Sequence, residues 1–395
     1  MKSVVTLKHL FKLSGKDGHP LGSEASSIYF DGQHAIAASH EATVSIDCPQ
    51  EIDRPLLVAI KDLKVAMIAG PNLQFRQIEG RLQINGVNVP AVPAEDVMPP
   101  ATAEILNLDK ATWRPVVRPF RLDGGRLSQI INAMGAGDIR FYLNGLYLDF
   151  ATGAIVGVDG KRLHLVEDAL PVVELPAGRM QGVILPAVMA KLLSSVGGVQ
   201  DVFVMEREEK KKDTEKEEMV IKRVICVGAA NAKFRIREIP SDTYPNYREP
   251  FDRNRSLPVA LVLDARATAD FLAVASIAAT NPNYPVVTIF GAGRHVTVSH
   301  RDQVRRQLPM SYEVGEAFEV HVRGDALCDA IRAAGSFGSA VRMRYGREDG
   351  RGIYVGAQDF HAILMTHKDE AEDPEDDESA SSASATDAVQ AAVLA

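Results

Sequence analysis

The sequence predicts an α+β protein in which one domain is repeated three times. Amphipathic helical patterns recur in pairs, and the intervals between them are strand-like and rich in turns. The predicted helices start near residues 7 and 61, 123 and 185, and 264 and 325, so the helices of a pair begin roughly 54 to 62 residues apart. A helix with one apolar stripe covers one face of a sheet, so each copy is expected to hold two helices and two sets of strands.

Each predicted helix carries apolar residues three and four positions apart, which places them on one face. In chain order these residues are Leu7, Leu10 and Phe11; Ile60, Leu63 and Met67; Leu127, Ile130, Ile131 and Met134; Leu185, Met189, Leu192, Leu193 and Val196; and Leu327, Ala330, Ile331 and Ala334. The fifth helix is expected to begin near Asp264. Thr6 and Asp325 are the expected caps of the first and last helices, and Pro186 falls in the first turn of the fourth.

The region 138–167 is predicted to form four short strands joined by turns. Around Phe141, apolar and polar residues alternate, which is the pattern of a half-buried strand and places the Phe141 ring in the core. The Asn-Gly pair at 144–145 and the Asp-Gly pair at 159–160 tolerate positive φ angles and predict tight hairpin turns.

Composition points to an ordinary globular chain. With 395 residues, of which 46% are hydrophobic, the chain has room for two or three domains. No apolar run approaches the roughly 18 residues of a membrane-spanning helix, and the first residues lack the apolar region of a secretory signal. Cys48, Cys226 and Cys328 are far apart and give neither a zinc-ligand spacing nor a disulfide framework. We therefore expect reduced thiols and a cytoplasmic protein.

The formal charge of −8 is concentrated at the C-terminus. Residues 369–395 contain nine acidic residues and no lysine or arginine, so the rest of the chain carries +1. The acidic average therefore does not exclude nucleic acid as a partner. The composition of this tail predicts disorder. A second charged segment, 206–218, is expected to be a solvated loop or hairpin tip.

The sequence contains no recognisable catalytic constellation. It has neither a GxxxxGK[ST] phosphate loop nor a GxSxG nucleophile motif, and Gly291-Ala-Gly293 lacks the third glycine of a dinucleotide site. The ten histidines are scattered, and His295 and His300 lie in a strand-like segment without metal-ligand partners. Asp159 is best explained as a turn residue. No catalytic residue, metal or cofactor is expected.

Three motifs resemble those of one family, in its order and at about its spacing. They are FYLNG at 141–145, VDGKRL at 158–163 and YPNYR at 244–248. The first two resemble the second domain of the bacterial sliding clamp, the beta subunit of DNA polymerase III. The third resembles the junction of its second and third domains. The resemblance extends from Met1 to about Lys368 and is faint in the first third.

The resemblance implies three clamp domains, each with two helices and two small antiparallel sheets, joined head to tail. Two subunits would form a ring around double-stranded DNA, with the helices lining the channel. Such a homodimer does no chemistry and binds DNA without regard to sequence. It tethers the DNA polymerase catalytic subunit and so makes synthesis processive, and an ATP-driven clamp loader opens the ring. The implied boundaries are 1–112, 113–252 and 253–368 for the domains and 369–395 for the acidic tail.

Basic residues at outward positions of the predicted helices are the candidate DNA contacts. Such residues attract phosphates without reading bases, as a sliding protein requires. They are Lys8, Lys12, Lys61, Lys64, Arg126, Lys191, Arg266 and Arg332. An ordinary solvated helix face is the alternative for any one of them. The segment 140–142 aligns with a DNA-contacting segment of the family. Within it Tyr142 is the candidate for stacking or phosphate contact, with ordinary strand packing as the alternative.

The resemblance also implies a cleft between the second and third domains that binds partner peptides of a Gln-x-x-Leu-Phe type. Its residues here would be Leu143, Val158, Gly160, Lys161, Arg162, Leu163, Pro245, Ile363, Leu364 and Met365. An apolar slot with a few polar groups at its rim suits a peptide anchor, and the flexible methionine suits several partners. The alternative is that these are plain core residues.

Three positions depart from the family pattern. Lys161 stands where histidine is frequent, Glu249 where arginine is common, and Thr366-His367 where the best-known members have Pro-Met. These changes predict a less apolar slot and a different preferred peptide.

Two further expectations concern the ends of the chain and its assembly. Ile277 aligns close to a family dimer-interface position, with a place in the core as the alternative. The segment 390–394, Gln-Ala-Ala-Val-Leu, loosely resembles the partner peptide and could occupy the cleft of its own chain.

Two rival functions remain at this stage. One is a specialised clamp paralogue, of plasmid or phage type, with its own polymerase or repair partner. The more distant one is an enzyme of repeated α+β domains with an unrecognised site. A stable particle of twice 42.8 kDa in solution fits the ring.

Overall fold

The computed structural model describes most of the chain up to residue 367. The described residues are 5–13, 27–39, 41–70, 74–78, 81–93, 108, 112–135, 137–173, 181–210, 219–240, 244–301, 303–336, 340–345 and 352–367. The acidic tail, the segment 390–394 and most of the charged run 206–218 lie outside them, so the predictions for these segments stay predictions.

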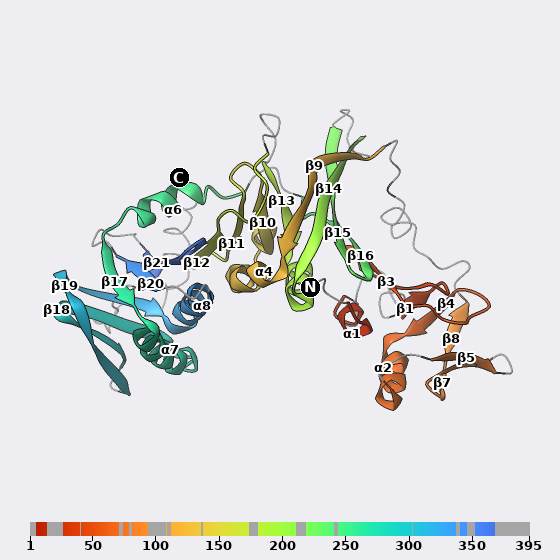
Figure 1. Cartoon of the computed structure of the whole chain (residues 1–395), viewed down its shortest axis with the longest axis horizontal. Helices are drawn as coiled ribbons and strands as arrows, with labels where there is room; N and C mark the ends of the chain where they lie inside the picture. The colour runs from red at the N-terminus through yellow and green to blue at the C-terminus, as the bar shows by residue number, and fades with distance from the viewer. Residues whose placement is uncertain are drawn as a thin grey trace, which may run out of the picture. The chain divides into compact units, whose positions relative to one another are not determined.

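The six predicted helices begin within two residues of their predicted starts. They are α1 (Leu7–Leu10), α2 (Ile60–Ala69), α4 (Gly124–Ile130), α5 (Ala187–Val196), α7 (Ala265–Ala279) and α8 (Gly324–Gly335), and Figure 1 labels all of them except α5. The 3-10 turn η2 (Ile131–Ala133) continues α4. The described residues also contain a helix that was not predicted, α6 (Arg248–Arg255).

By its internal contacts the chain divides into two compact units. Unit 1 comprises residues 1–127 and 183–240, and unit 2 comprises residues 128–182 and 241–395. This division neither supports nor opposes the three predicted domain ranges, which remain a prediction.

Unit 1 contains a nine-stranded antiparallel sheet and a small three-stranded one. The large sheet has the order β8 (Ala91–Pro93), β4 (Leu56–Ala59), β1 (Ser27–Phe30), β2 (His34–Ala38), β3 (Ala42–Asp47), β16 (Ala232–Arg237), β15 (Met219–Ala229), β14 (Val199–Lys210) and β9 (Arg114–Asp123). The small sheet has the order β5 (Phe75–Ile78), β6 (Arg81–Ile84) and β7 (Val87–Val89). Strand β13 (Gly182–Pro186) is not part of it and comes directly before α5. The pair β14–β15 runs to Lys210 opposite Met219, so 206–210 is strand and not loop.

Helix α1 is only four residues long and is held at its start by a capping box. The backbone N–H of Thr6 donates to His9 Nδ1, and the Thr6 hydroxyl lies 2.9 Å from the same ring nitrogen. This confirms Thr6 as the cap and adds the second half of the motif. Leu10 and Leu63 are fully buried, so α1 and α2 each place one apolar side in the core.

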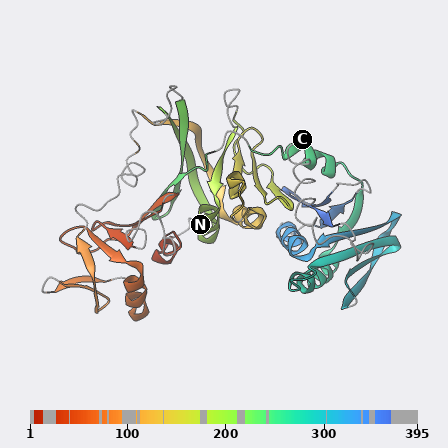
Figure 2. The same ribbon diagram turned by 180° about the vertical axis from the view of Figure 1, so that it is seen from behind.

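Unit 2 contains a continuous sheet that joins residues far apart in the sequence. Its strands follow in the order β10 (Gly145–Asp149), β11 (Ala154–Val158), β12 (Arg162–Val166), β22 (Phe360–Leu364), β21 (Ile353–Ala357), β20 (Val341–Arg344) and β17 (Val259–Leu263). A second sheet pairs β18 (Val286–His300) with β19 (Val304–Arg323) and β19 with β23 (Thr366–His367). Helices α7 and α8 lie side by side, with α7 against β18 and β19 (Figure 2).

Glycine at position 324 allows α7 and α8 to approach each other. A Cβ atom at Gly324 would lie 2.7 Å from the carbonyl oxygen of Ala275 on α7, which is closer than packed atoms come. Asp264 accepts a hydrogen bond from the backbone N–H of Ala267 and caps α7, which begins near Asp264 as predicted. Asp325 was expected to cap α8, but the helix begins one residue earlier. Its carboxylate instead binds Arg323.

The register of the sheet assigns side chains to its two faces. Partners directly opposite each other in an antiparallel pair point to the same face. Leu163 pairs with both Val158 and Ile363, so these three share one face. Arg162 pairs with Leu364, and both point to the other face.

Helix α6 covers the Leu163 face and is held there by charged and aromatic contacts. Phe251 is fully buried, and its ring centroid lies 5.3 Å from that of His361 on β22. His361 Nε2 lies 3.0 Å from Glu167, whose two carboxylate oxygens each accept from Arg255 of α6 at 3.1 Å. The His361 Nδ1 is 2.6 Å from the Tyr354 hydroxyl. Burial, as the largest effect, lowers the pKa of His361.

The segment before β10 is the clearest departure from the predicted secondary structure. Phe141–Leu143 forms a 3-10 turn, η3, and not a strand, and the Phe141 side chain is 53% exposed where burial was expected. Asn144 has φ −77° and does not form the predicted positive-φ turn. Its side chain accepts from the backbone N–H of Asp138 and donates to the Asp138 carbonyl oxygen, and so closes the loop. The turn at 159–160 does form, with Gly160 at φ +83°.

The cysteines are free, as expected. Cys226 and Cys328 are buried, whereas Cys48 is half-buried. In the part of the chain that the structure describes, no helix is long and apolar enough to cross a membrane.

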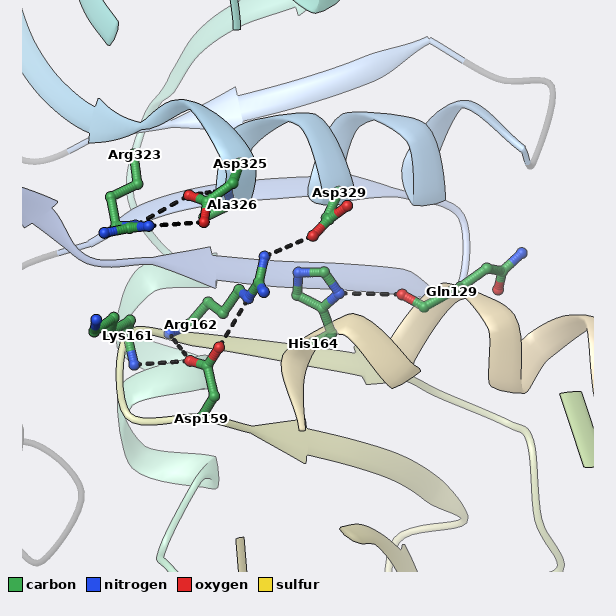
Figure 3. A network of polar contacts seen from close by, with 9 residues as sticks. All are labelled: Gln129, Asp159, Lys161, Arg162, His164, Arg323, Asp325, Ala326 and Asp329. Atoms are coloured by element: carbon green, nitrogen blue, oxygen red, sulfur yellow. Dashed lines mark hydrogen bonds and ion pairs between the residues drawn. The ribbon is translucent and has the colours of Figure 1, made fainter. Parts of the chain in front are cut away.

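His164 is a buried titratable group that links stability to pH. It is fully buried on β12, and its Nδ1 donates to the Gln129 carbonyl oxygen at 3.1 Å (Figure 3). Burial, as the largest effect, lowers its pKa to about 4, and the positive charge of Arg162 acts in the same direction. The hydrogen bond to Gln129 opposes both.

We predict that this histidine makes the protein less stable in acid. The unfolded chain binds a proton at an ordinary pKa of about 6.5, so stability falls as the pH drops from 6.5 to 4. The full loss is roughly 3 kcal/mol. Urea unfolding of a His164→Phe variant should show a correspondingly shallower pH dependence over this range. Equal slopes in the wild type and the variant would contradict the assignment.

Candidate partner-binding site

The candidate site is built around the turn between β11 and β12. The Asp159 carboxylate folds over this turn, where Oδ1 accepts from the backbone N–H groups of Lys161 at 2.9 Å and Arg162 at 3.0 Å. The Asp159 backbone N–H donates to the Arg162 carbonyl oxygen. Asp159 is therefore the turn residue that the sequence indicated.

Arg162 joins this turn to helix α8. Its Nε donates to Asp159 Oδ2 at 3.0 Å, and its Nη1 donates to Asp329 Oδ2 at 2.7 Å (Figure 3). The side chain of Arg162 is 14% exposed, that of Asp159 is 19% exposed and that of Asp329 is 21% exposed. The two ion pairs are therefore largely shielded from water. Shielding strengthens such pairs, and it makes the loss of one partner costly. Asp329 was not predicted, because 167 residues separate it from Arg162.

A second arginine lies against the same turn. Arg140 forms a two-pronged ion pair with Asp138, through Nε at 3.0 Å and Nη2 at 2.8 Å. The hydrogen bonds of this pair lower the pKa of the Asp138 carboxyl. A Cβ atom on Gly160 would lie 2.9 Å from the Arg140 guanidinium. The positive φ of Gly160, +83°, is the reason for glycine at this turn, since the end of the Arg140 side chain could move aside.

The structure brings together some of the predicted peptide-contact residues on one face. Val158, Leu163 and Ile363 share the face that α6 covers, and Met365 donates its backbone N–H to the Lys161 carbonyl oxygen at 3.0 Å. Arg162 and Leu364 belong to the opposite face, where Arg162 reaches α8. All ten predicted residues lie within unit 2, but they do not form a single side-chain surface.

The predicted site is mostly closed in the unliganded chain. The apolar members of the set are buried, with Leu163 only 7% and Ile363 only 6% exposed. Met365 is half-buried and Lys161 is exposed. A peptide anchor would therefore have to displace apolar side chains at the end of the sheet, and Met365 is the most exposed of the apolar members.

Pro245 lies in the ordered segment that enters α6. The preceding Tyr244 stacks on Tyr147 of β10, with centroids 4.4 Å apart and the planes at 15°. The Tyr247 hydroxyl donates to Asp149 and lies 3.1 Å from the Thr152 hydroxyl. These contacts fix the YPNYR motif against β10.

The departures from the family pattern lie near these elements. Glu249 is exposed in the first turn of α6, and Thr366–His367 forms the short strand β23, in which His367 pairs with His321. Glu249 therefore belongs to a helix, and Thr366 and His367 belong to a strand.

The basic candidate DNA contacts lie on helices, except Lys12, which follows the end of α1. Lys8, Lys12, Lys61, Lys64, Lys191, Arg266 and Arg332 are exposed, and Arg126 is half-buried. Lys12 donates to the Ser195 hydroxyl at 3.2 Å, and Arg332 donates to that of Ser276 at 3.3 Å. Tyr142 is half-buried and forms an edge contact with the Phe141 ring.

The predicted interface residue also lies at the surface. Ile277 is 42% exposed on α7, which removes a fully buried core position as the alternative. Among the described residues, no group of three or more histidine, cysteine or acidic side chains could hold a metal ion.

The same fold occurs in bacterial DNA polymerase sliding clamps. No protein-family model matches the sequence, and no curated protein matches it either. The solved structures do match. Among them are a sliding clamp from Pseudomonas aeruginosa with ligand, at 17% identity and a TM-score of 0.64, and one from Bacillus subtilis, at 12% and 0.68. A third, from Caulobacter crescentus with polyethylene glycol bound, has 19% identity and a TM-score of 0.66. Each alignment covers 92% of this chain and 96% or 97% of the clamp.

These matches give the chain the sliding-clamp fold, in which the α+β unit is repeated. The resemblance detected in three short motifs therefore extends over nearly the whole described chain. At these identities the likeness carries the fold and not the function.

Proposed function

We propose that this protein is a DNA sliding clamp that encircles double-stranded DNA and tethers a DNA polymerase to it. The observation that supports this most is the match of the full clamp fold, which leaves at most 4% of the compared clamps uncovered. The proposed clamp is a homodimer, does no chemistry itself and takes no cofactor. An ATP-driven loader places it on DNA in the cytoplasm.

The exposed basic residues on the helices support DNA as the partner. Seven of the eight predicted lysines and arginines are exposed on or beside helices of both units. Such charges bind phosphates in a sequence-independent and salt-sensitive way. Tethering through ring closure needs only weak contacts of this kind, because the ring itself prevents escape.

The turn between β11 and β12 supports partner binding. Lys161 and Met365 offer an exposed cation and a half-buried apolar side chain where β12 and the end of β22 meet. A short peptide with a Leu-Phe end could anchor on Met365, Leu163 and Ile363 by displacing them slightly. Val158 lies beside Leu163 and would extend the apolar floor.

A specialised clamp paralogue is the second candidate. Glu249, exposed at the start of α6, gives this part of the surface a negative charge where the family commonly has arginine. A partner peptide with a basic residue would suit this chain better than the usual motif. Peptide preference, not fold, separates the two candidates.

We predict that a labelled Gln-Leu-Asp-Leu-Phe peptide binds the full chain with a micromolar dissociation constant. A variant carrying Leu163→Ala and Met365→Ala should lose this binding, because both apolar anchors are shortened. Fluorescence anisotropy gives the affinity. Met343→Ala, on β20 of the same sheet, serves as the matched control and should bind normally. Normal binding by the double variant would place the peptide elsewhere.

We predict that reversing two charges on α2 weakens DNA binding. Lys61→Glu with Lys64→Glu should lower the affinity for a duplex by about tenfold at low salt and flatten the salt dependence. Anisotropy of a labelled duplex measures both. Lys233→Glu, exposed on β16 of the same unit, should have a smaller effect. An equal loss in both variants would show a general charge effect and remove α2 as a DNA-facing element.

We predict that the protein is a dimer of twice 42.8 kDa in solution. Ile277→Arg should shift it to the monomer mass, because a charge at an apolar interface is costly to bury. Light scattering after size-exclusion chromatography gives the mass. Val172→Arg, at another exposed apolar position, should remain dimeric. A wild-type monomer would contradict the proposed ring.

A further inference from the structure

The carboxylate of Asp329 connects helix α8 to the candidate partner site. It accepts a 2.7 Å hydrogen bond from Nη1 of Arg162, whose backbone begins β12 beside the turn (Figure 3). Asp329 is 79% shielded and sits in the middle of α8, between Cys328 and Ala330, which are both buried. Its backbone is therefore fixed by the core of unit 2.

Arg162 depends on this contact for its position. Asp159 holds Nε, but Asp159 belongs to the same turn and moves with it. Asp329 is the partner on a separate element, and it holds the turn relative to the rest of unit 2. A guanidinium that lost Asp329 would keep its charge in a largely shielded place, and it would gain by turning toward water.

The neighbours of Arg162 are the residues on which the proposed peptide site depends. Lys161 precedes it and accepts the Met365 hydrogen bond through its carbonyl oxygen, and Leu163 follows it on the opposite face of the sheet. A shift of Arg162 therefore moves both Lys161, at the exposed edge of that site, and Leu163, which is one of its apolar residues. Contacts misplaced by a small distance lose much of their binding energy, because peptide recognition relies on a preformed arrangement.

We propose that Asp329 is a positioning residue for partner binding, acting through Arg162 on the turn between β11 and β12. This rests on the proposed function, since it takes that turn as the peptide site. Asp329 does not touch the peptide. It acts from the α8 face of the sheet, whereas Leu163 and Ile363 belong to the α6 face.

The matched comparison lies one turn away on the same helix. Asp325 also forms an ion pair, with Nε of Arg323 at 3.0 Å and Nη2 at 2.8 Å, and the charge of Arg162 acts on it as one of the weaker effects. Asp329→Asn and Asp325→Asn each replace one carboxylate by an amide of the same shape. Only Asp329→Asn removes an ion pair with a residue next to the turn, namely Arg162.

The test measures the affinity of the full chain for the labelled Gln-Leu-Asp-Leu-Phe peptide. Asp329→Asn should weaken binding about tenfold, the scale of a hydrogen bond between charged groups, and Asp325→Asn should change it less than about twofold. Combined with Arg162→Gln, the Asp329→Asn change should cause no further loss. If Asp329 only supported the fold, Asp329→Asn would weaken peptide binding by the same factor in the wild type and in the Arg162→Gln variant. Thermal unfolding of each variant reports its folding separately.

The outcomes separate this proposal from the proposed function. Suppose that the wild type binds the peptide and the Leu163→Ala and Met365→Ala double variant does not. Normal binding by Asp329→Asn would then show that the positioning role is wrong, and the clamp function would stand. A loss of equal size with and without Arg162 also overturns it. If the wild type does not bind the peptide, the positioning role and the peptide site fall together.

Discussion

The pairing of β12 with β22 is the constraint on which the rest of unit 2 depends. It places Leu163 opposite Ile363 and Arg162 opposite Leu364, and so joins two segments some 200 residues apart in one sheet. Without this register the turn at 159–160 would have no contact with the last strand, and the predicted peptide residues would lie in two separate places. The period-two geometry of the strands then decides the chemistry of each face: apolar residues under α6, and the Arg162 ion pairs toward α8.

The charged groups that flank this sheet fix elements that packing alone would leave free. Helix α6 has eight residues, and most of them are polar or charged, so its burial energy is small. The Phe251 ring and the Arg255–Glu167–His361 contacts hold it against β12 and β22. On the other face, Arg162 ties the turn to α8. Shielded ion pairs contribute little net stability, but an arrangement that separates the partners leaves a shielded charge unpaired, which is costly.

The sequence predicted the elements whose signal is local and long. Helices α5, α7 and α8 carry apolar residues over several turns, and their starts follow from this periodicity. The segment 139–143 was misassigned because three alternating residues fit a 3-10 turn as well as a strand, and the hydrogen bonds of Asn144 to Asp138 decided the outcome. Helix α6 has no apolar stripe to detect. The Asp-Gly pair predicted the turn at 159–160, but only the family resemblance pointed to it as a binding site. The Asp329–Arg162 ion pair depends on the tertiary fold and was not predicted.

The low identity to known clamps is compatible with the proposed function for a physical reason. A protein that holds DNA by encircling it needs sheets that continue, helices with basic surfaces and a site for partner peptides, but it needs few specific side chains for DNA. Identities of 12% to 19% over 92% of the chain fit such a demand. Substitution is restricted at positions where the backbone conformation requires a particular residue. One of them is Gly160, which has a positive φ and lies beside Arg140. In contrast, Lys161 and Glu249 lie on the surface, where a change of charge leaves the fold intact.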